Sequence, residues 1–192
     1  MRNVTRAGVL ALTLILATGL IGATSFTQAT LIRDTNIDVV SDTNGYIALE
    51  DMLSGDVVRE DSTGELSIDF TTGSAQGVNV DSIYELGTPG WSDNATDEQA
   101  FNITNHDSVT RTIYLNYSLS GADPGDGAHN ATEFQIYDSS GTNLATISED
   151  DTGASFSMTS GESVAVVVIV DSTDSAITQS DDLSGTLNVT AT

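Results

Sequence analysis

Apolar and polar residues alternate along most of the chain beyond residue 30, and no stretch shows a sustained helical period. The clearest alternation spans residues 112–119, where Ile113, Leu115, Tyr117 and Leu119 are separated by threonine, tyrosine, asparagine and serine. A two-residue period places successive side chains on opposite faces of an extended strand. This segment therefore predicts a β-strand with one face toward a core and one toward water.

Shorter runs repeat the alternation and are separated by clusters of turn-forming residues. The runs occupy residues 37–39, 46–49, 66–70, 78–80, 101–103, 134–136 and 187–189. The turn clusters occupy residues 72–73, 105–108, 121–127, 139–143 and 160–162. Eight or so short strands at this spacing predict an all-β domain, an antiparallel β-sandwich or jelly roll of Ig-like type. Residues 46–53 and 83–86 are also compatible with short helices.

One predicted strand departs from alternation, because every residue from 164 to 170 is apolar. Both faces of such a strand need cover. In one interpretation it is a central strand whose outer side is covered by a loop or helix of the same chain. In the other, Val167 and Ile169 lie under a neighbouring subunit.

The first 29 residues have the layout of an export signal. Arg2 and Arg6 precede an apolar run over residues 9–22, which small residues follow. We expect a signal helix over residues 1–29, cleaved between Ala23 and Ala29, before a single β-sandwich domain over residues 30–192. The run is shorter than the ~20 residues of a membrane-spanning helix. A retained anchor and a pilin-type leader cleaved near residues 7–8 are the alternatives.

The charge balance is strongly acidic, with 28 acidic residues, five arginines, no lysine and a net charge of -23. In dilute buffer this charge destabilises the compact state through self-repulsion. At 1 M ionic strength, where the Debye length is roughly 3 Å, that repulsion is screened. We therefore interpret the acidity as adaptation to high salt, the alternative being a surface evolved for calcium or a cationic partner. Nucleic acid is excluded as a partner because the sequence lacks the clustered basic residues that bind its phosphates.

Few residues offer catalytic or metal chemistry, so the protein is not expected to be an enzyme or to carry a cofactor. Cysteine is absent, and neither His106 nor His129 has a sequence neighbour at metal-ligand spacing. Two pairs of residues are weak candidates for calcium ligands, because they offer hard oxygen atoms in tight turns. They are Asp123 with Asp126, and Asp42 with Asn44.

The asparagines indicate glycosylation, because six of the eleven stand in Asn-x-Ser/Thr sequons, the acceptor motif for N-linked glycans. One of them, Asn3, lies in the export signal. Alternation turns several of the others toward solvent, as a glycan requires. The glycosylation candidates are Asn94, Asn102, Asn116, Asn130 and Asn188.

Four segments resemble a family of secreted proteins from halophilic archaea. They are residues 33–49 (RDTNIDVVSDTNGYIAL), 100–105 (AFNITN), 160–166 (SGESVAV) and 185–191 (GTLNVTA). More remotely, the layout resembles the camelysin/TasA group of biofilm fibre proteins and the archaeal bundling pili. That resemblance implies jelly-roll subunits with a cleaved signal, in which a freed N-terminal segment completes the sheet of the next subunit.

The leading expectation is thus a secreted, extracellular structural protein of the cell surface or biofilm matrix, whose partners are copies of itself or other cell-surface proteins. Residues 30–40 would be the donor strand, with Leu31, Ile37 and Val39 as anchors and the edge near residues 164–170 as acceptor. Alternatively, this segment pairs within its own domain. The alternative function is a monomeric secreted adhesion module of Ig-like type, which binds through loops 87–98 and 121–130.

Overall fold

The computed structural model describes residues 42–53, 57–71, 74, 76–94, 96–120 and 130–192, which fall in one compact unit spanning residues 39–192. The predicted signal segment, residues 1–29, and the predicted donor strand, residues 30–40, lie outside the described residues. The described chain is almost entirely β, as predicted, with one short 3-10 helix, η1. The elements are η1 (Asp42–Asn44), β1 (Ile47–Asp51), β2 (Val58–Glu60), β3 (Leu66–Ile68), β4 (Ile83–Leu86), β5 (Phe101–Asn105), β6 (Arg111–Leu119), β7 (Thr132–Tyr137), β8 (Asn143–Ser148), β9 (Ala154–Met158), β10 (Ser163–Asp171) and β11 (Gly185–Ala191).

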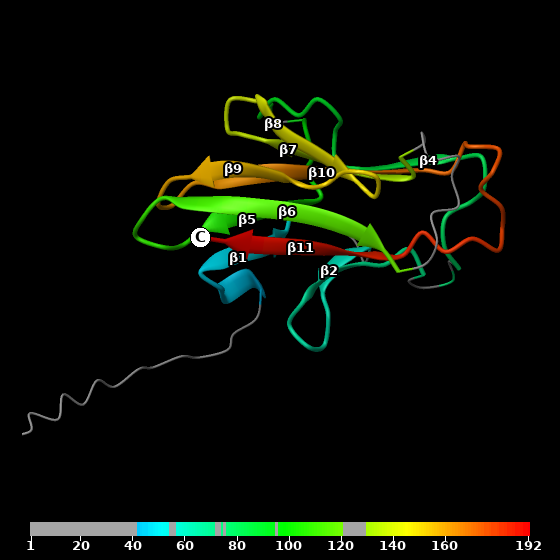
Figure 1. Ribbon diagram of the computed structural model, residues 1–192, viewed down its shortest axis with the longest axis horizontal. Helices are drawn as coiled ribbons and strands as arrows, with labels where there is room; N and C mark the ends of the chain where they lie inside the picture. Colours follow the sequence, from blue (N-terminus) through cyan, green and yellow to red (C-terminus); the bar gives the residue numbers. More distant parts are fainter. Residues whose placement is uncertain (1–41, 54–56, 72–73, 75, 95, 121–129) are drawn as a thin grey trace, which may run out of the picture. The chain divides into compact units, whose positions relative to one another are not determined.

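One layer is a six-stranded antiparallel sheet, with strand order β1-β5-β10-β7-β8 and with β4 also paired to β10 (Figure 1). The long strand β10 is its centre. On one side β10 pairs with β5 through its first residues and with β4 through its last, and on the other side it pairs with β7. Its continuously apolar sequence fits a strand covered on both faces, by the core on one side and by the cluster around Trp91 on the other.

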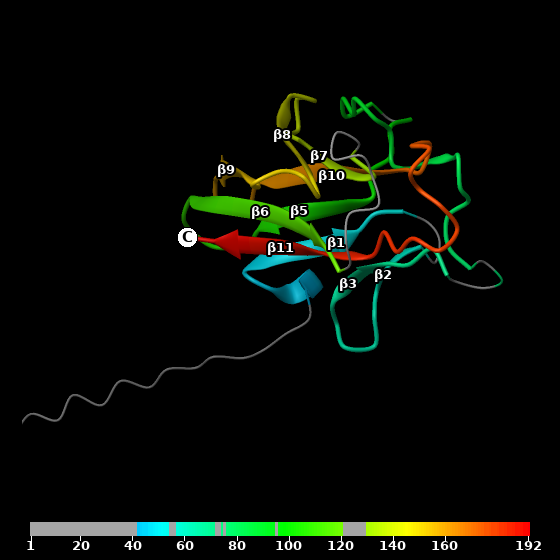
Figure 2. The same cartoon turned by 45° about the vertical axis from the view of Figure 1, so that its right-hand side comes forward.

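The opposing layer is split into two parts. A three-stranded sheet of order β11-β6-β9 forms one part, and the β2–β3 hairpin forms the other (Figure 2). Both parts pack onto the same apolar core as the six-stranded sheet. The molecule is therefore an antiparallel sandwich whose second layer is interrupted between β11 and β3.

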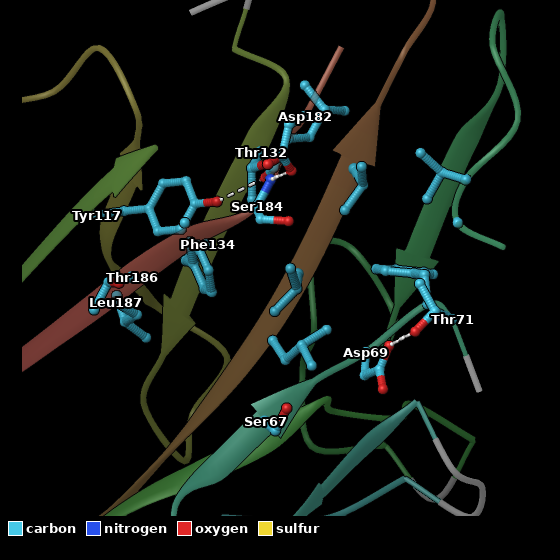
Figure 3. A pocket seen from close by; sticks show the side chains of 18 of the residues that line it. Ser67, Asp69, Thr71, Tyr117, Thr132, Phe134, Asp182, Ser184, Thr186 and Leu187 are labelled. Atoms are coloured by element: carbon cyan, nitrogen blue, oxygen red, sulfur yellow. Dashed lines mark hydrogen bonds between the residues drawn. The ribbon is translucent and has the colours of Figure 1, made fainter. Parts of the chain in front are cut away.

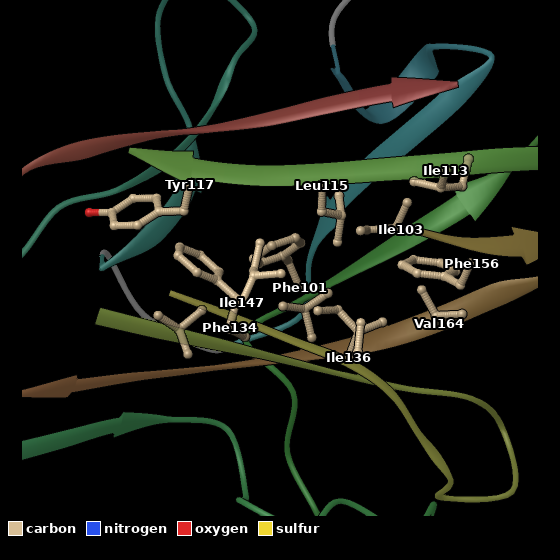
Figure 4. Close-up of a cluster of buried hydrophobic side chains, with 14 of the residues drawn as sticks. Phe101, Ile103, Ile113, Leu115, Tyr117, Phe134, Ile136, Ile147, Phe156 and Val164 are labelled. Carbon is tan, nitrogen blue, oxygen red and sulfur yellow. The ribbon is translucent and has the colours of Figure 1, made fainter. Parts of the chain in front are cut away.

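The core between the layers is built from alternate residues of each strand. Ile113, Leu115 and Tyr117 of β6 are buried opposite Phe134 and Ile136 of β7, as the two-residue period predicts (Figure 4). Burying each large apolar side chain stabilises the fold by about 1.5–3 kcal/mol.

A smaller apolar cluster covers the outer side of β10. Trp91, carried by the loop between β4 and β5, packs with Tyr137, Ala165 and Val167, and Ile169 is half-buried beside them. The peptide N–H of Gly90 donates to the Tyr137 hydroxyl at 3.0 Å and holds the loop against the sheet. Val167 is fully buried by the loop, as the first interpretation expects. Ile169 is only half-buried, and its cover by a neighbouring subunit stays a prediction.

Two sequence predictions of secondary structure need correction. Residues 78–80 form no strand. Val80 is 40% exposed, so this short apolar run does not pack into the core. Residues 46–53 and 83–86 contain strands β1 and β4 and no helix. Strands β2, β8 and β9 were not predicted, although Phe156 and Met158 of β9 alternate with serines.

Candidate functional site

A groove of about 980 Å³ opens where the second layer is interrupted. One wall is β11 and the other is β3, so it is called the β11–β3 groove below. Figure 3 shows Leu187 on β11 and Ser67 on β3, with strand β10 passing behind the space between them. The groove thus reaches down to buried residues on the inner face of the six-stranded sheet, between the two parts of the second layer.

Apolar and polar side chains together line the groove. Its floor is formed by core residues of the opposite sheet, including Phe101, Phe134 and Val168. Its walls carry Leu187 and Val189 of β11, which remain half-buried although they point to the core side. Leu66 and Ile68 of β3 are likewise half-buried. Covering such a half-buried apolar face with another apolar element is favourable, because it removes apolar surface from water.

The backbone edges of the groove complement an incoming strand. Among the described strands, β11 pairs with β6 alone and β3 pairs with β2 alone, so each presents one edge to the groove. Such an edge carries N–H and C=O groups that pair with a further strand. Neither wall strand contains proline or lysine, the residues that commonly protect an exposed edge.

The first described residue, Asp42, lies at the β3 wall. Its peptide N–H donates to Gly64 O at 2.8 Å, and its Oδ2 accepts from Leu66 N–H at 2.7 Å. The chain that precedes Asp42 is the predicted donor segment. The polypeptide therefore enters the described fold beside one wall of the groove.

Tyr117 lines the groove next to β11. Its hydroxyl donates to Leu183 O at 3.1 Å, and its ring lies 5.0 Å from that of Phe134. Burial raises the pKa of Tyr117 above its ordinary value, so the hydroxyl stays protonated at neutral pH. Gly185, the first residue of β11, fits because a side chain there would collide with the Tyr117 ring and the Ser118 carbonyl.

The rim of the groove is acidic. Asp42, Glu65, Asp69, Asp181 and Asp182 are among the residues that line it. The Asp69 carboxylate lies 2.9 Å from the Arg59 guanidinium. The hydroxyl and peptide N–H of Ser184 hold the pKa of Asp182 below its usual value, so this carboxylate is charged at neutral pH.

The predicted acceptor edge is in the wrong place. Residues 164–170 belong to β10, which has neighbours on both sides and no free edge. Continuous apolarity identified a strand buried on both faces, which is usually central rather than marginal. The edges that border the groove instead belong to β11 and β3, whose alternating sequences do not distinguish them from strands paired on both sides.

The other predicted site residues are scattered. Asp123, Asp126 and His129 lie outside the described residues, and Asp42 binds the β3 backbone. His106 is exposed, with its ring 3.2 Å from Gly45 O. Within the described ranges, no three His, Asp or Glu side chains gather closely enough to hold a metal ion. Nor does any described helix have the length and hydrophobicity needed to cross a bilayer.

The candidate glycosylation residues differ in their surroundings. Asn116 and Asn188 are exposed on the outer face of the three-stranded sheet, as predicted. Asn102 alternates with buried Phe101 and Ile103 but is only half-exposed, and its Oδ1 is buried without a hydrogen-bond partner among the described residues. Asn94 donates to Ser92 Oγ at 2.5 Å, and Asn130 accepts from Ser148 Oγ at 3.0 Å.

The chain matches no model of a known protein family, and no curated protein matches its sequence. The function is therefore inferred from the geometry of the β11–β3 groove.

Proposed function

We propose that this protein is an exported structural subunit of the cell surface or extracellular matrix, in which residues 30–40 of one copy lie as a strand in the β11–β3 groove of the next. The observation that carries the proposal is the groove itself, which is bordered by the unpaired edge of β11 and by an edge of β3 on which Asp42 binds the Leu66 N–H, above an apolar floor. A strand added there satisfies edge hydrogen bonds and buries alternate side chains.

The composition of residues 30–40 supports this role. Leu31, Ile37 and Val39 stand at odd positions and share one face of an extended segment. The eleven residues reach about 36 Å when extended, against about 23 Å for a seven-residue strand such as β11.

High salt fits the same proposal. Copies of this strongly acidic chain repel each other in dilute buffer, and screening at molar salt lets them approach. Assembly is therefore expected in molar salt and is expected to weaken as salt is removed.

The test compares four single variants of the secreted protein by size-exclusion chromatography and electron microscopy in molar salt. Leu187→Glu places a charge in the groove, and Ile37→Glu places one on the donor face. Thr186→Glu and Asn36→Glu place the same charge on the opposite faces of the same segments. We expect fibres or a size ladder from the native chain and from the two outward variants, and monomers from the two inward variants.

Mixing the two inward variants gives a sharper outcome. Leu187→Glu keeps an intact donor and Ile37→Glu keeps an intact groove, so together they should form a one-to-one dimer that grows no further. A native chain that stays monomeric at every concentration in molar salt would instead support the alternative function, a monomeric binding module.

A further inference from the structure

The outer face of the three-stranded sheet carries no charge. Its outward positions on β6 are Thr112, Tyr114, Asn116 and Ser118, and those on β9 are serines. The outward positions inside β11 are threonine, asparagine and threonine. On a chain with 28 acidic residues, such a face is a marked exception.

A shallow hollow of about 270 Å³ lies in this face. Its base includes Gly153, whose φ of +92° and whose closeness to Leu115 O leave no room for a side chain. Tyr114, which is 48% exposed, stands on one side of the hollow. Asn116 and Asn188 also line it.

The two asparagines are direct partners across the β6–β11 pair. Opposite residues of antiparallel strands have Cβ atoms about 5 Å apart. Each asparagine begins a sequon, which Ser118 completes for Asn116 and Thr190 completes for Asn188. The fold therefore brings together two sequons that lie 72 residues apart in the sequence.

We propose that Asn116 and Asn188 form one shared N-glycosylation site, which carries a single glycan whose first sugar lies in the hollow against the Tyr114 ring. A lipid-phosphate-linked sugar is the donor. The asparagine Nδ2 forms a bond to the anomeric carbon and loses a proton, while the bond from that carbon to the carrier phosphate oxygen breaks and the phosphate leaves with the electron pair.

Crowding limits the pair to one glycan. Two sugar rings attached at Cβ atoms about 5 Å apart compete for the same space above the sheet. The Tyr114 ring offers an apolar surface to the C–H face of the sugar, and the uncharged hydroxyl and amide groups around it hydrogen-bond to the sugar without a charge to desolvate.

The proposal rests on the export stated above and is independent of assembly. Its first test is glycopeptide and intact-mass analysis of the full chain secreted by the cells that produce it. Ser118→Ala and Thr190→Ala each remove one sequon and leave both asparagines in place. We expect one glycan per pair in the native chain, transfer to Asn188 in Ser118→Ala, retention at Asn116 in Thr190→Ala, and at least a tenfold loss at both sites in the double variant.

The second test addresses the hollow. Loss of the glycan in the double variant should lower the melting temperature by about 3 °C when Tyr114 is present, and by much less in a Tyr114→Ser background. An equal fall in melting temperature with and without Tyr114 would overturn the proposed contact between the sugar and the Tyr114 ring. Two glycans on one molecule would overturn the sharing, and an exported, ladder-forming protein with neither asparagine modified would overturn this site while leaving the proposed function standing.

Discussion

Asn105 is fully buried, and its Nδ2 lies within 3.1 Å of the carbonyl oxygens of Val109, Met158 and Thr159. Its Oδ1 accepts from the peptide N–H of Asp107 at 3.0 Å. This one side chain ties the turn between β5 and β6 to the end of β9. The sequence placed Asn105 in a turn because asparagine favours turns, and nothing local in it identified the distant carbonyls.

Replacing Asn105 with alanine should destabilise the fold by about 3 kcal/mol, because buried carbonyl oxygens lose their hydrogen-bond donor. The exposed Asn143 is the matched control, and its replacement with alanine should change stability by no more than about 0.5 kcal/mol. Denaturant unfolding in molar salt measures both. Equal stability of the two variants would show that the buried amide contributes little.

Several aspartates accept hydrogen bonds within their own turns. The hydroxyl of Thr63 holds the pKa of Asp61 below its usual value, and the hydroxyls of Thr71 and Ser140 do the same for Asp69 and Asp138. Hydrogen bonds to the charged form favour that form. In the folded chain these carboxylates therefore bind protons at lower pH than in the unfolded chain.

The lowered pKa values of these aspartates determine how the stability of the protein depends on pH. Because these pKa values are lower in the folded state, their stabilising contribution is present above the unfolded value near pH 4 and is lost as pH falls through the folded values. In molar salt, where charge repulsion is screened, we expect a melting temperature that is level from pH 7 to about 5 and falls below about pH 4. A melting temperature that rises steadily from pH 5 to 2.5 would contradict this account.

At the scale of elements, the apolar strand β10 illustrates what a pattern can predict. Seven consecutive apolar residues predicted cover on both faces, and the structure supplies it with the core on one side and Trp91 on the other. The cover comes from a loop that contains no other large apolar residue. Its single tryptophan is the only local sign of the role.

Trp91→Ala should destabilise the protein by about 3 kcal/mol, because it removes a large apolar side chain from Val167 and Tyr137. Tyr46, 76% exposed, is the matched aromatic control, and Tyr46→Ala should have little effect. Thermal unfolding compares the two variants. The Trp91 variant should keep the assembly state of the native chain, since the loop lies away from the β11–β3 groove. If Trp91→Ala left the melting temperature unchanged, the loop would not cover strand β10.

At the scale of the whole molecule, the charge predicts a dependence on salt. With 28 acidic residues against five arginines, removing salt restores repulsion across the surface. We expect dialysis from molar to millimolar salt to lower the melting temperature and to loosen or unfold the domain. Circular dichroism during stepwise dialysis measures it, and a stability that stays constant across that range would refute the interpretation of the charge.

Alternation predicted the fold class and most core residues, but it could not locate the groove. The period of β11 marks Leu187 and Val189 as inward-facing, and this is correct. Whether a strand has a neighbour on each edge depends on pairing between distant segments, which a local period does not encode. For that reason the apolar pattern points to β10 as the acceptor, whereas the edges that border the groove belong to β11 and β3.

The most direct measurement of strand exchange uses the absence of cysteine from the chain. A double variant with Asp38→Cys in the donor segment and Thr186→Cys on β11 has two thiols and no others, and both substitutions lie on outward faces. After treatment with a short bifunctional maleimide in molar salt, a denaturing gel should show a ladder of covalent multimers, and each single variant should give no ladder. A double variant that runs only as a monomer, whether internally bridged or unmodified, would contradict strand exchange between copies.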